Sequence, residues 1–473
     1  MVVQHNMQAA NANRMLNVTT SAQSKSTEKL SSGYRINRAA DDAAGLTISE
    51  KMRKQIRGLD QASTNAQDGV SSVQTAEGAL TEVHSMLQRM NELATQAANG
   101  TNSKDSDRQA IQDEIDQLTT EIDRVSETTK FNETYLLKGE DGTKTINMKA
   151  HDAGLKGKLT DNGDGTATFV MDTLNAGDKV SIGGKSYTIG SDDAEVEKWF
   201  TDNGNDVKDE ATKKVTVNGT EYTYYAAKAA NTTAGSLTDG WDAGWYASAP
   251  TDKGDGTGTA LSGKFANVDA IKAEVKKGAT VQNGTKSVTG MNDTTPKDGV
   301  SDTDATVISK NKAYELASKE LLKANQIGDT EGNAQVGTGA DVDVAVDLTH
   351  GDGTFSIKVG QAKVANSLAF SLHVGADADM TNKIQVNIDA MDSASLGIKG
   401  LNVKDDSGNA ATYAVDAISD AISKVSSQRS ALGAVQNRLE HTINNLDNVV
   451  ENTTTAESRI RDTDMAEEMV NYS

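Results

Sequence analysis

Three short sequences rich in Asp and Gly are the first candidates for chemistry, because their spacing resembles a calcium-binding loop. They are Asp161–Thr166, Asp252–Thr257 and Gly351–Thr354. A calcium loop of the helix-loop-helix type needs oxygen ligands at alternating positions and a terminal bidentate Glu, and none of the three supplies that Glu. Asp-Gly between alternating apolar residues is the usual signal of a hairpin turn. The pattern therefore favours turns over metal sites.

The histidines and the remaining nucleophiles show no catalytic spacing. The six histidines are scattered, with no paired arrangement of the kind that zinc requires: His5, His84, His151, His350, His373 and His441. A nucleophile elbow, a phosphate-binding loop and a dinucleotide fingerprint are all missing from the sequence. There is no cysteine, which excludes disulfides and thiolate metal sites. We therefore expect no enzymatic activity, no metal and no cofactor.

Charge and hydropathy narrow the classes of partner. The formal net charge of −21 argues against nucleic acid and anionic membranes, which both need clustered Lys and Arg. No apolar run approaches the length of a membrane span. The first residues, Met1–Val18, lack the basic and apolar regions of a classical signal peptide. If the protein is exported, we expect a different route.

Two long helices organise the elements around these candidate sites. Apolar residues recur every three or four positions from Leu46 to Ala97, including Val73, Leu80, Val83, Leu87, Met90 and Leu93. The same period runs from Val415 to Ile460, through Ile418, Val425, Leu432, Leu439 and Leu446. This period predicts a coiled-coil-like stripe on each helix. Each helix would be roughly 70 Å long, so the two stripes must bury one another.

The rest of the chain supplies shorter elements. After a breaker at Asn99–Asn102, a second helix is predicted over Asp105–Thr128, antiparallel to the first. Asp41 or Asp42 is positioned to cap the first long helix. From about Glu140 to Met391, alternating runs predict antiparallel strands, interrupted by one helix over Lys310–Asn325. The runs are Lys179–Ile182, Ser186–Ile189, Val215–Val217, Asp341–Val346, Phe355–Val359, Leu368–Val374 and Ile384–Ile388.

These elements predict a mainly α-helical rod, a long antiparallel helical bundle made from both termini, with β-rich outer domains inserted in it. Four segments in the rod resemble, in the right order, the signatures of bacterial flagellin, the filament subunit. They are Leu30–Leu46, Leu87–Gln96, Glu121–Ser126 and Ala456–Met469. The signature residues carried over from the family are Arg35, Asn37, Asp41, Asp42, Arg459, Arg461 and Asp462.

The resemblance implies a division of the chain into filament-core, rod and outer segments. Residues 1–42 would form the N-terminal filament-core segment and 43–139 the N-terminal rod domain. Residues 140–367 would form the variable outer domains, 368–458 the C-terminal rod domain and 459–473 the start of a truncated C-terminal filament-core segment. Flagellins continue with a further helix that pairs with the N-terminal segment, whereas this sequence stops at Ser473. We therefore expect residues 1 to about 40 to be poorly ordered and normal filaments not to form.

The resemblance also implies a function and partners. It implies a secreted structural protein of the extracellular flagellum that polymerises for motility, with a hook-filament junction protein or a surface adhesin as alternatives. The implied partners are other flagellin subunits, the flagellar type III export apparatus, an export chaperone and toll-like receptor 5. The receptor contacts carried over from the family are Gln88, Arg89, Glu92, Leu93, Gln96, Ile111, Gln112 and Glu114. The alternative for Leu93 is that it belongs to the buried stripe.

Overall fold

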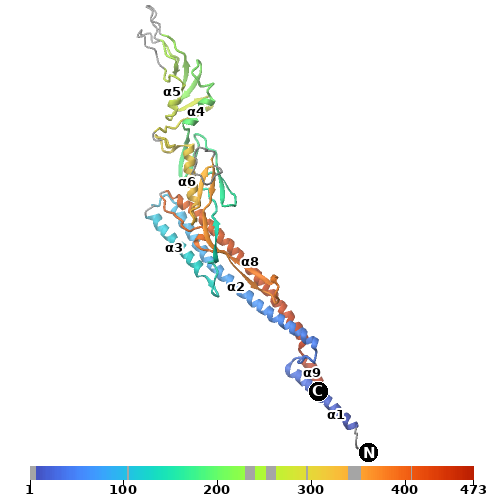
Figure 1. Cartoon of the computed structure of the whole chain (residues 1–473). Helices are drawn as coiled ribbons and strands as arrows, with labels where there is room; N and C mark the ends of the chain where they lie inside the picture. Colours follow the sequence, from blue (N-terminus) through green and yellow to red (C-terminus); the bar gives the residue numbers. More distant parts are fainter. Residues whose placement is uncertain are drawn as a thin grey trace, which may run out of the picture.

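The computed structural model describes residues 7–103, 106–229, 240–251, 263–294, 297–338, 353–405 and 407–473. The molecule is elongated, and both chain ends lie at the same end of it (Figure 1). The rod helices follow, then a first outer domain around α6 (Lys310–Asn325). A tip domain with α4 (Asp193–Asp202) and α5 (Val268–Val275) lies at the far end (Figure 1). The chain thus runs outward through the rod and returns through it.

Three helices form the rod, as predicted. They are α2 (Ala43–Ala97), α3 (Asp107–Thr128) and α8 (Asn409–Arg461). Helix α2 begins at its cap Asp42, whose carboxylate accepts a 2.8 Å hydrogen bond from the N–H of Gly45. The apolar stripes of α2 and α8 meet in one buried core that includes Leu80, Leu87 and Leu432. Burial of these stripes stabilises helices of a length that could not persist alone in water.

Small sheets and a short helix extend the rod core towards the outer domains. The strand pairs are β1 (Lys130–Phe131) with β2 (Thr134–Tyr135), β3 (Glu140–Asn147) with β16 (Gln361–Asn366), and β17 (Leu368–His373) with β18 (Lys383–Ile388). All three pairs are antiparallel. A 3₁₀ turn, Met380–Asn382, precedes β18, and α7 (Ser393–Leu396) precedes α8. The β17–β18 pair lies on α2 and α8, where Ile384 and Leu439 share a small core.

The first outer domain has its own core around α6 (Lys310–Asn325), a helix that the sequence predicted with the same bounds. Four strands form one sheet in the order β14 (Gln335–Thr338), β15 (Thr354–Lys358), β5 (Thr166–Met171) and β4 (Gly157–Asp161). Three others form a second sheet in the order β13 (Val307–Ser309), β7 (Lys185–Gly190) and β6 (Lys179–Ile182). The rings of Phe169 and Phe355 stack in the middle of the core, with their centres 6.2 Å apart.

The tip domain is a five-stranded sheet with two helices. Its strand order is β10 (Gly244–Tyr246), β9 (Thr220–Tyr225), β8 (Lys214–Val217), β11 (Thr280–Asn283) and β12 (Lys286–Thr289). The helices are α4 (Asp193–Asp202) and α5 (Val268–Val275), which the sequence did not predict. Their apolar faces are only two residues wide, Val196 with Phe200 and Ile271 with Val275, too short for a helical period to stand out.

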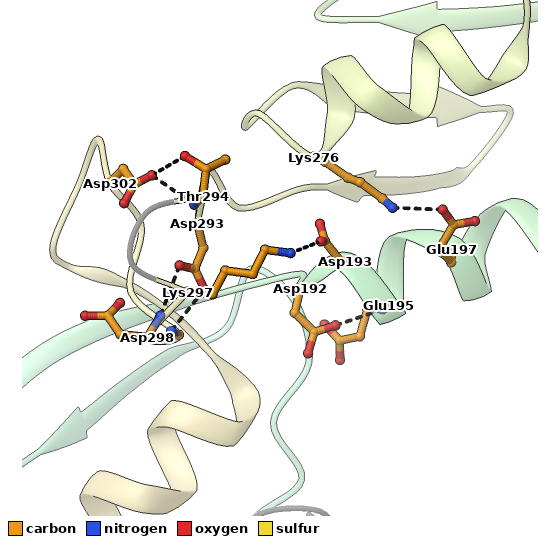
Figure 2. Close-up of polar contacts among 11 residues, drawn as sticks. Asp192, Asp193, Glu195, Glu197, Lys276, Asp293, Thr294, Lys297, Asp298 and Asp302 are labelled. Atoms are coloured by element: carbon orange, nitrogen blue, oxygen red, sulfur yellow. Dashed lines mark hydrogen bonds and ion pairs between the residues drawn. The ribbon is translucent and has the colours of Figure 1, made fainter.

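Two chain crossings join the tip domain to the first outer domain. The N–H of Met291 donates to the carbonyl of Ser191 at 2.9 Å, which ties the outgoing segment to the returning one. Figure 2 shows the charged side chains beside this crossing, where Lys297 Nζ lies 2.7 Å from Asp193 Oδ2 and Lys276 Nζ lies 2.8 Å from Glu197 Oε1. Asp193 and Glu197 are thus paired with lysines at this crossing.

Several expectations concern segments outside the rod. The turn at Asp161–Thr166 does connect two antiparallel strands. Asp252–Thr257, Asp341–Val346 and the first two residues of Gly351–Thr354 lie outside the described residues. The expectation of poor order near the N-terminus is wrong for residues 7–32, which form helix α1 (Met7–Ser32). Its second half packs on α9 (Met465–Tyr472), so the end of the chain supplies a partner that we did not anticipate.

Candidate interaction surfaces of the rod

A charged cluster connects the outer faces of α2 and α3. Arg89 on α2 reaches across to α3, where its Nε lies 2.9 Å from Glu114 Oε1. Its Nη1 lies 3.2 Å from Glu92 Oε2, one turn further along α2. These two hydrogen bonds, the stronger one to Glu114, raise the pKa of Arg89 above its ordinary value. The Arg89 side chain is half exposed, so the pairs contribute little stability but place a charge on an accessible face.

The residues carried over from the family for receptor contact divide into two groups. Gln88, Arg89, Glu92 and Gln96 are exposed, and Gln112 and Glu114 are half-buried; we call these six residues the Arg89 patch. Leu93 is only 2% exposed and Ile111 only 6%, and both belong to the rod core. Leu93 and Ile111 thus pack in the rod core, and their contact with a receptor stays a prediction. Their helical positions point them inward, at the junction of α2, α3 and α8.

Gln112 has a structural role within this patch. Its Nε2 donates to the carbonyl of Leu401 at 2.9 Å, and its Oε1 accepts from the N–H of Val403 at 2.8 Å. The side chain thus fastens the segment before α8 to α3. Its amide is largely occupied, so Gln112 positions the patch instead of offering free hydrogen-bonding groups.

A buried arginine closes the outer end of α2. Arg108, in the first turn of α3, is 2% exposed. Its guanidinium donates to the carbonyls of Ala97 at 2.9 Å, Asn99 at 3.3 Å and Asp405 at 2.7 Å. These carbonyls lie at or beyond the C-terminus of α2 and before α8, where the backbone lacks intrahelical donors. The sequence gives no local signal for this role, because the three acceptors are backbone atoms.

The family signature residues meet at the inner end of the rod, where two distant segments pair. The N–H of Arg35 donates to the carbonyl of Arg461 at 2.7 Å, and the N–H of Thr463 donates to the carbonyl of Gly33 at 3.0 Å. We call Gly33–Asn37 together with Ile460–Thr463 the terminal clasp. The Arg461 guanidinium also lies 5.0 Å from the centre of the Tyr34 ring and pairs with Glu50 at 2.9 Å.

The other signature residues shape the turn into α2. Asp41 Oδ2 accepts from the N–H groups of Asn37 at 3.2 Å and Arg38 at 2.8 Å. The hydrogen bond from Arg38, followed by the one from Asn37, lowers the Asp41 pKa in spite of some desolvation. Asp462 accepts from the Ser458 hydroxyl at 2.6 Å, whereas Arg459 is exposed. The signature therefore encodes a clasp between the two ends of the chain, which linear spacing does not reveal.

Beyond the clasp, α1 and α9 leave large apolar side chains in solvent. Ser26 donates to Glu468 Oε1 at 2.8 Å, and Lys29 lies 3.5 Å from the same carboxylate, which holds the helices together. Met7, Met15, Leu16 and Val18 on α1 and Met465, Met469, Val470 and Tyr472 on α9 are all more than 40% exposed. A concentration of exposed apolar groups on two helices marks an interaction surface. We call these eight residues the terminal apolar surface.

Comparison with known proteins shows the family to which this chain belongs. Residues 3–141 match the bacterial flagellin N-terminal helical region, and residues 415–473 match the bacterial flagellin C-terminal helical region. A flagellin of Clostridium tyrobutyricum is 35% identical over 477 residues, covering 100% of this chain and 94% of that protein. The chain belongs to the bacterial flagellin family. As a flagellin, it is a structural subunit of the flagellar filament.

Other flagellins are similar along the same length or over a shorter stretch of the chain. Flagellin C of Vibrio anguillarum is 33% identical and covers 98% of this flagellin and 90% of the relative. A flagellin of Halalkalibacterium halodurans is 56% identical over 149 residues, which cover 32% of this chain and 54% of that protein. Identity is thus higher in a comparison limited to about a third of the chain.

Two solved structures match with low superposition scores. FliC of Burkholderia pseudomallei covers 78% of this flagellin and 99% of its own chain, at 19% identity and a TM-score of 0.25. Hook-associated protein 3 of Legionella pneumophila covers 87% of this chain and 98% of its own, at 14% identity and a TM-score of 0.32.

Two further observations concern the chemistry of this flagellin. Within the described ranges, no three His, Asp or Glu side chains gather closely enough to hold a metal ion. None of the described helices has the length and apolar character needed to cross a membrane.

Proposed function

We propose that the terminal apolar surface is where one subunit packs against its neighbours in the filament. The observation that carries this proposal is the exposure of eight large apolar side chains on α1 and α9 next to the terminal clasp. Burying one such side chain yields about 1.5–3 kcal/mol, so several together would drive association. A repeated, non-closing contact between identical subunits generates a helical filament. The role is structural, without a catalytic step.

This proposal departs from our expectation from the sequence that normal filaments do not form, because α9 supplies α1 with a partner helix. The test compares polymer growth of the wild-type chain with that of Leu16→Gln and Val470→Gln. Sulfate salts strengthen apolar burial, so association is induced with ammonium sulfate and followed by light scattering and negative-stain microscopy. Both variants are expected to lose most of the polymer signal while circular dichroism stays unchanged. Val170→Gln is the matched control, because Val170 is 44% exposed in the first outer domain. Equal growth of all four proteins would contradict the proposal.

We also propose that export proteins bind this surface before the subunit leaves the cell. The segment around α1 would be read by the flagellar type III export apparatus, and an export chaperone would cover the exposed apolar side chains until assembly outside the cell. Removing residues 7–29 leaves the terminal clasp intact. Secretion of this variant is expected to stop while the rod stays folded, and secretion at the wild-type level would count against the proposal.

For the Arg89 patch we propose recognition by toll-like receptor 5. The support is the exposed Arg89, held by Glu92 and Glu114 on a face shared by α2 and α3. An anchored arginine on an accessible face is a common hot spot, worth about 2 kcal/mol or more when truncated. Its two carboxylate partners fix the guanidinium and cut the entropy lost on binding.

A titration of the receptor ectodomain tests this second role. Arg89→Ala and Glu114→Ala are expected to weaken binding by roughly tenfold or more. Arg124→Ala is the matched control, because Arg124 is also an exposed arginine paired with a carboxylate one turn away, Glu121 on α3. Binding of Arg89→Ala as tight as that of the wild type would refute the assignment.

A further inference from the structure

We propose that Asn99 is a site of spontaneous covalent modification, at which its side-chain amide is lost through attack by the following backbone nitrogen. The sequence contains five Asn-Gly pairs, beginning at Asn99, Asn162, Asn203, Asn218 and Asn283. Glycine after asparagine leaves the backbone nitrogen sterically open to the side chain. The surroundings of the five pairs differ, and they single out Asn99.

The turn after α2 leaves Asn99 and the nitrogen that follows it accessible. Asn99 and Gly100 are both exposed, and a side chain added at Gly100 would meet no atom within 4 Å. The N–H of Thr101 donates to Asn99 Oδ1 at 3.2 Å. Negative charge develops on this oxygen during attack at Cγ, so a donor already in place lowers the barrier. The hydrogen bonds of the described residues leave the N–H of Gly100 without an acceptor.

The same turn also activates the attacking nitrogen. That nitrogen belongs to the peptide group between Asn99 and Gly100, whose carbonyl oxygen accepts from Arg108 Nη2 at 3.3 Å and from the N–H of Asn102 at 3.1 Å. The peptide nitrogen must lose its proton before it attacks. A guanidinium cation and a second donor on the conjugated oxygen stabilise the anion that results.

The other four pairs are held in conformations that oppose the reaction. Asn203 is 4% exposed, and its side chain is bonded to Trp199 and Lys286. Asn218 Oδ1 accepts from Thr280, and its backbone pairs with the same residue. In the pair that begins at Asn162, the N–H of Gly163 donates to Asp161.

The last pair begins at Asn283, which ends β11 and pairs with Lys286 in a tight hairpin. The three glycines of the pairs that begin at Asn162, Asn218 and Asn283 have positive φ angles fixed by their turns. In these four pairs the asparagine is buried, or the glycine N–H is already bonded, or the glycine φ angle is fixed in the positive range, and each of these restricts attack by the nitrogen. The Asn99-Gly100 pair combines an exposed side chain with an activated backbone nitrogen.

The reaction has two balanced steps. In the first, the Gly100 nitrogen loses its proton to solvent base and bonds to Asn99 Cγ, the Cγ–Nδ2 bond breaks, and the amide leaves as ammonia after taking up a proton. In the second, water opens the cyclic imide at either carbonyl and gives aspartate or isoaspartate. Both products carry a new carboxylate, and isoaspartate also adds one methylene to the backbone.

Conversion would alter the end of α2. The backbone carbonyl of Asn99 is one of the three acceptors of the buried Arg108, and the turn sets the approach of α3 to α2. An added negative charge there lies beside this guanidinium, whereas a longer backbone displaces the carbonyl. The modification therefore acts on the junction of α2, α3 and α8 without touching the terminal clasp.

The test follows all five pairs in the folded chain by peptide mass spectrometry during incubation at mildly alkaline pH. Asn99 is expected to convert roughly tenfold or more faster than each of the other four, and Gly100→Ala is expected to slow it by a similar factor. A free peptide spanning residues 96–103 is measured in parallel, and Asn99 in the folded chain is expected to react at least as fast.

Circular dichroism verifies that Gly100→Ala is folded, and the comparison among the five pairs needs no variant. Conversion of Asn99 no faster than that of the other pairs would overturn the proposal. So would a rate unchanged by Gly100→Ala, or a rate in the folded chain roughly tenfold below that of the free peptide.

Discussion

The guanidinium of Arg35 donates a 2.6 Å hydrogen bond to the carbonyl oxygen of Ile460, which lies 425 positions further along the chain. The backbone N–H of the same arginine donates to Arg461. Arg35 thus ties both its side chain and its main chain to the segment that follows α8. Because α1 and α9 extend beyond this point, their relative placement depends on the clasp.

Replacing Arg35 by Ala is expected to loosen the terminal clasp without unfolding the rod. The side-chain bond to Ile460 is lost, whereas the backbone bond remains. Amide exchange in residues 33–38 and 460–465 should become several-fold faster, because local opening requires less free energy. Arg38→Ala is the control, since the Arg38 side chain pairs with nearby Glu28 on the surface. Unchanged exchange in both segments would show that the side chain contributes nothing.

Removal of the buried Arg108 side chain is expected to lower the free energy of unfolding much more than Arg35→Ala does. Arg108→Ala leaves the carbonyls of Ala97 and Asp405 without their donor and opens a cavity, so the rod should lose roughly 2–4 kcal/mol in urea unfolding. Arg124→Ala, which removes an exposed arginine from the same helix, should change stability by about 0.5 kcal/mol or less. A loss of similar size in both variants would contradict the role of Arg108.

The variant Leu93→Ala distinguishes an effect on the stability of the rod from an effect on receptor binding. Because its side chain lies in the rod core, Leu93→Ala is expected to destabilise the rod by roughly 2–5 kcal/mol. At temperatures where the variant is fully folded, its affinity for the receptor should equal that of the wild type. Calorimetry and binding titrations on the same samples decide this. A folded Leu93→Ala variant with selectively weakened binding would place Leu93 back in the contact surface.

Asp405 should make the start of α8 sensitive to acid. Burial raises its pKa, but hydrogen bonds from the Ser407 hydroxyl and from the N–H groups of residues 408–410 more than offset burial, so the pKa lies below 3.8. A depressed carboxyl pKa adds stability that is complete above pH 3.8 and is lost as pH falls through the folded value. Both Asp405 oxygens accept hydrogen bonds, and Asn replaces one of them by an NH2 donor, so Asp405→Asn is expected to cost about 1 kcal/mol at pH 7.

The cost of Asp405→Asn should shrink towards zero as the pH falls below 3.8. Chemical denaturation of wild type and variant across this range measures the difference. Asp416→Asn is the comparison. Burial raises the pKa of Asp416, so its contribution to stability changes with pH in the opposite direction to that of Asp405. The folded state then favours the protonated acid, so the Asp416 carboxylate weakens stability as pH rises above 3.8. A constant cost of Asp405→Asn at all pH values would refute this account.

The sequence predicted the elements that carry a long apolar period. Helices α2, α3 and α8 lie within a few residues of their predicted bounds because a stripe repeated over many turns leaves few alternatives. Helix α6 was also predicted, whereas α4 and α5 were missed because one or two turns give too few repeats. Strands such as β6 and β18 were found from their alternation.

The sites were harder to predict, because they depend on atoms that carry no sequence pattern. The resemblance to flagellins brought Arg89 and Glu114 together correctly, since both stand on predicted helices. For Leu93 the sequence left open a receptor contact or a place in the buried stripe, and its burial follows from where α3 and α8 pack. The roles of Arg108 and Arg35 were missed because their acceptors are main-chain carbonyls contributed by distant segments. Side-chain identity alone does not reveal such contacts.

The pairing of β3 with β16 has a kinetic consequence. In the rod, Ser63 on α2 contacts Asp447 on α8 across 384 residues, and closing so long a loop costs entropy that grows with its length. Once the outer domains fold and Asn147 pairs with Gln361, the two rod segments are already neighbours and the effective loop is far shorter. Pulse-labelled hydrogen exchange should show protection of β3 and β16 before α8, and the reverse order would contradict this. Folding of the outer domains thereby determines when α2 and α8 can pair, in addition to forming the outer surface of the molecule.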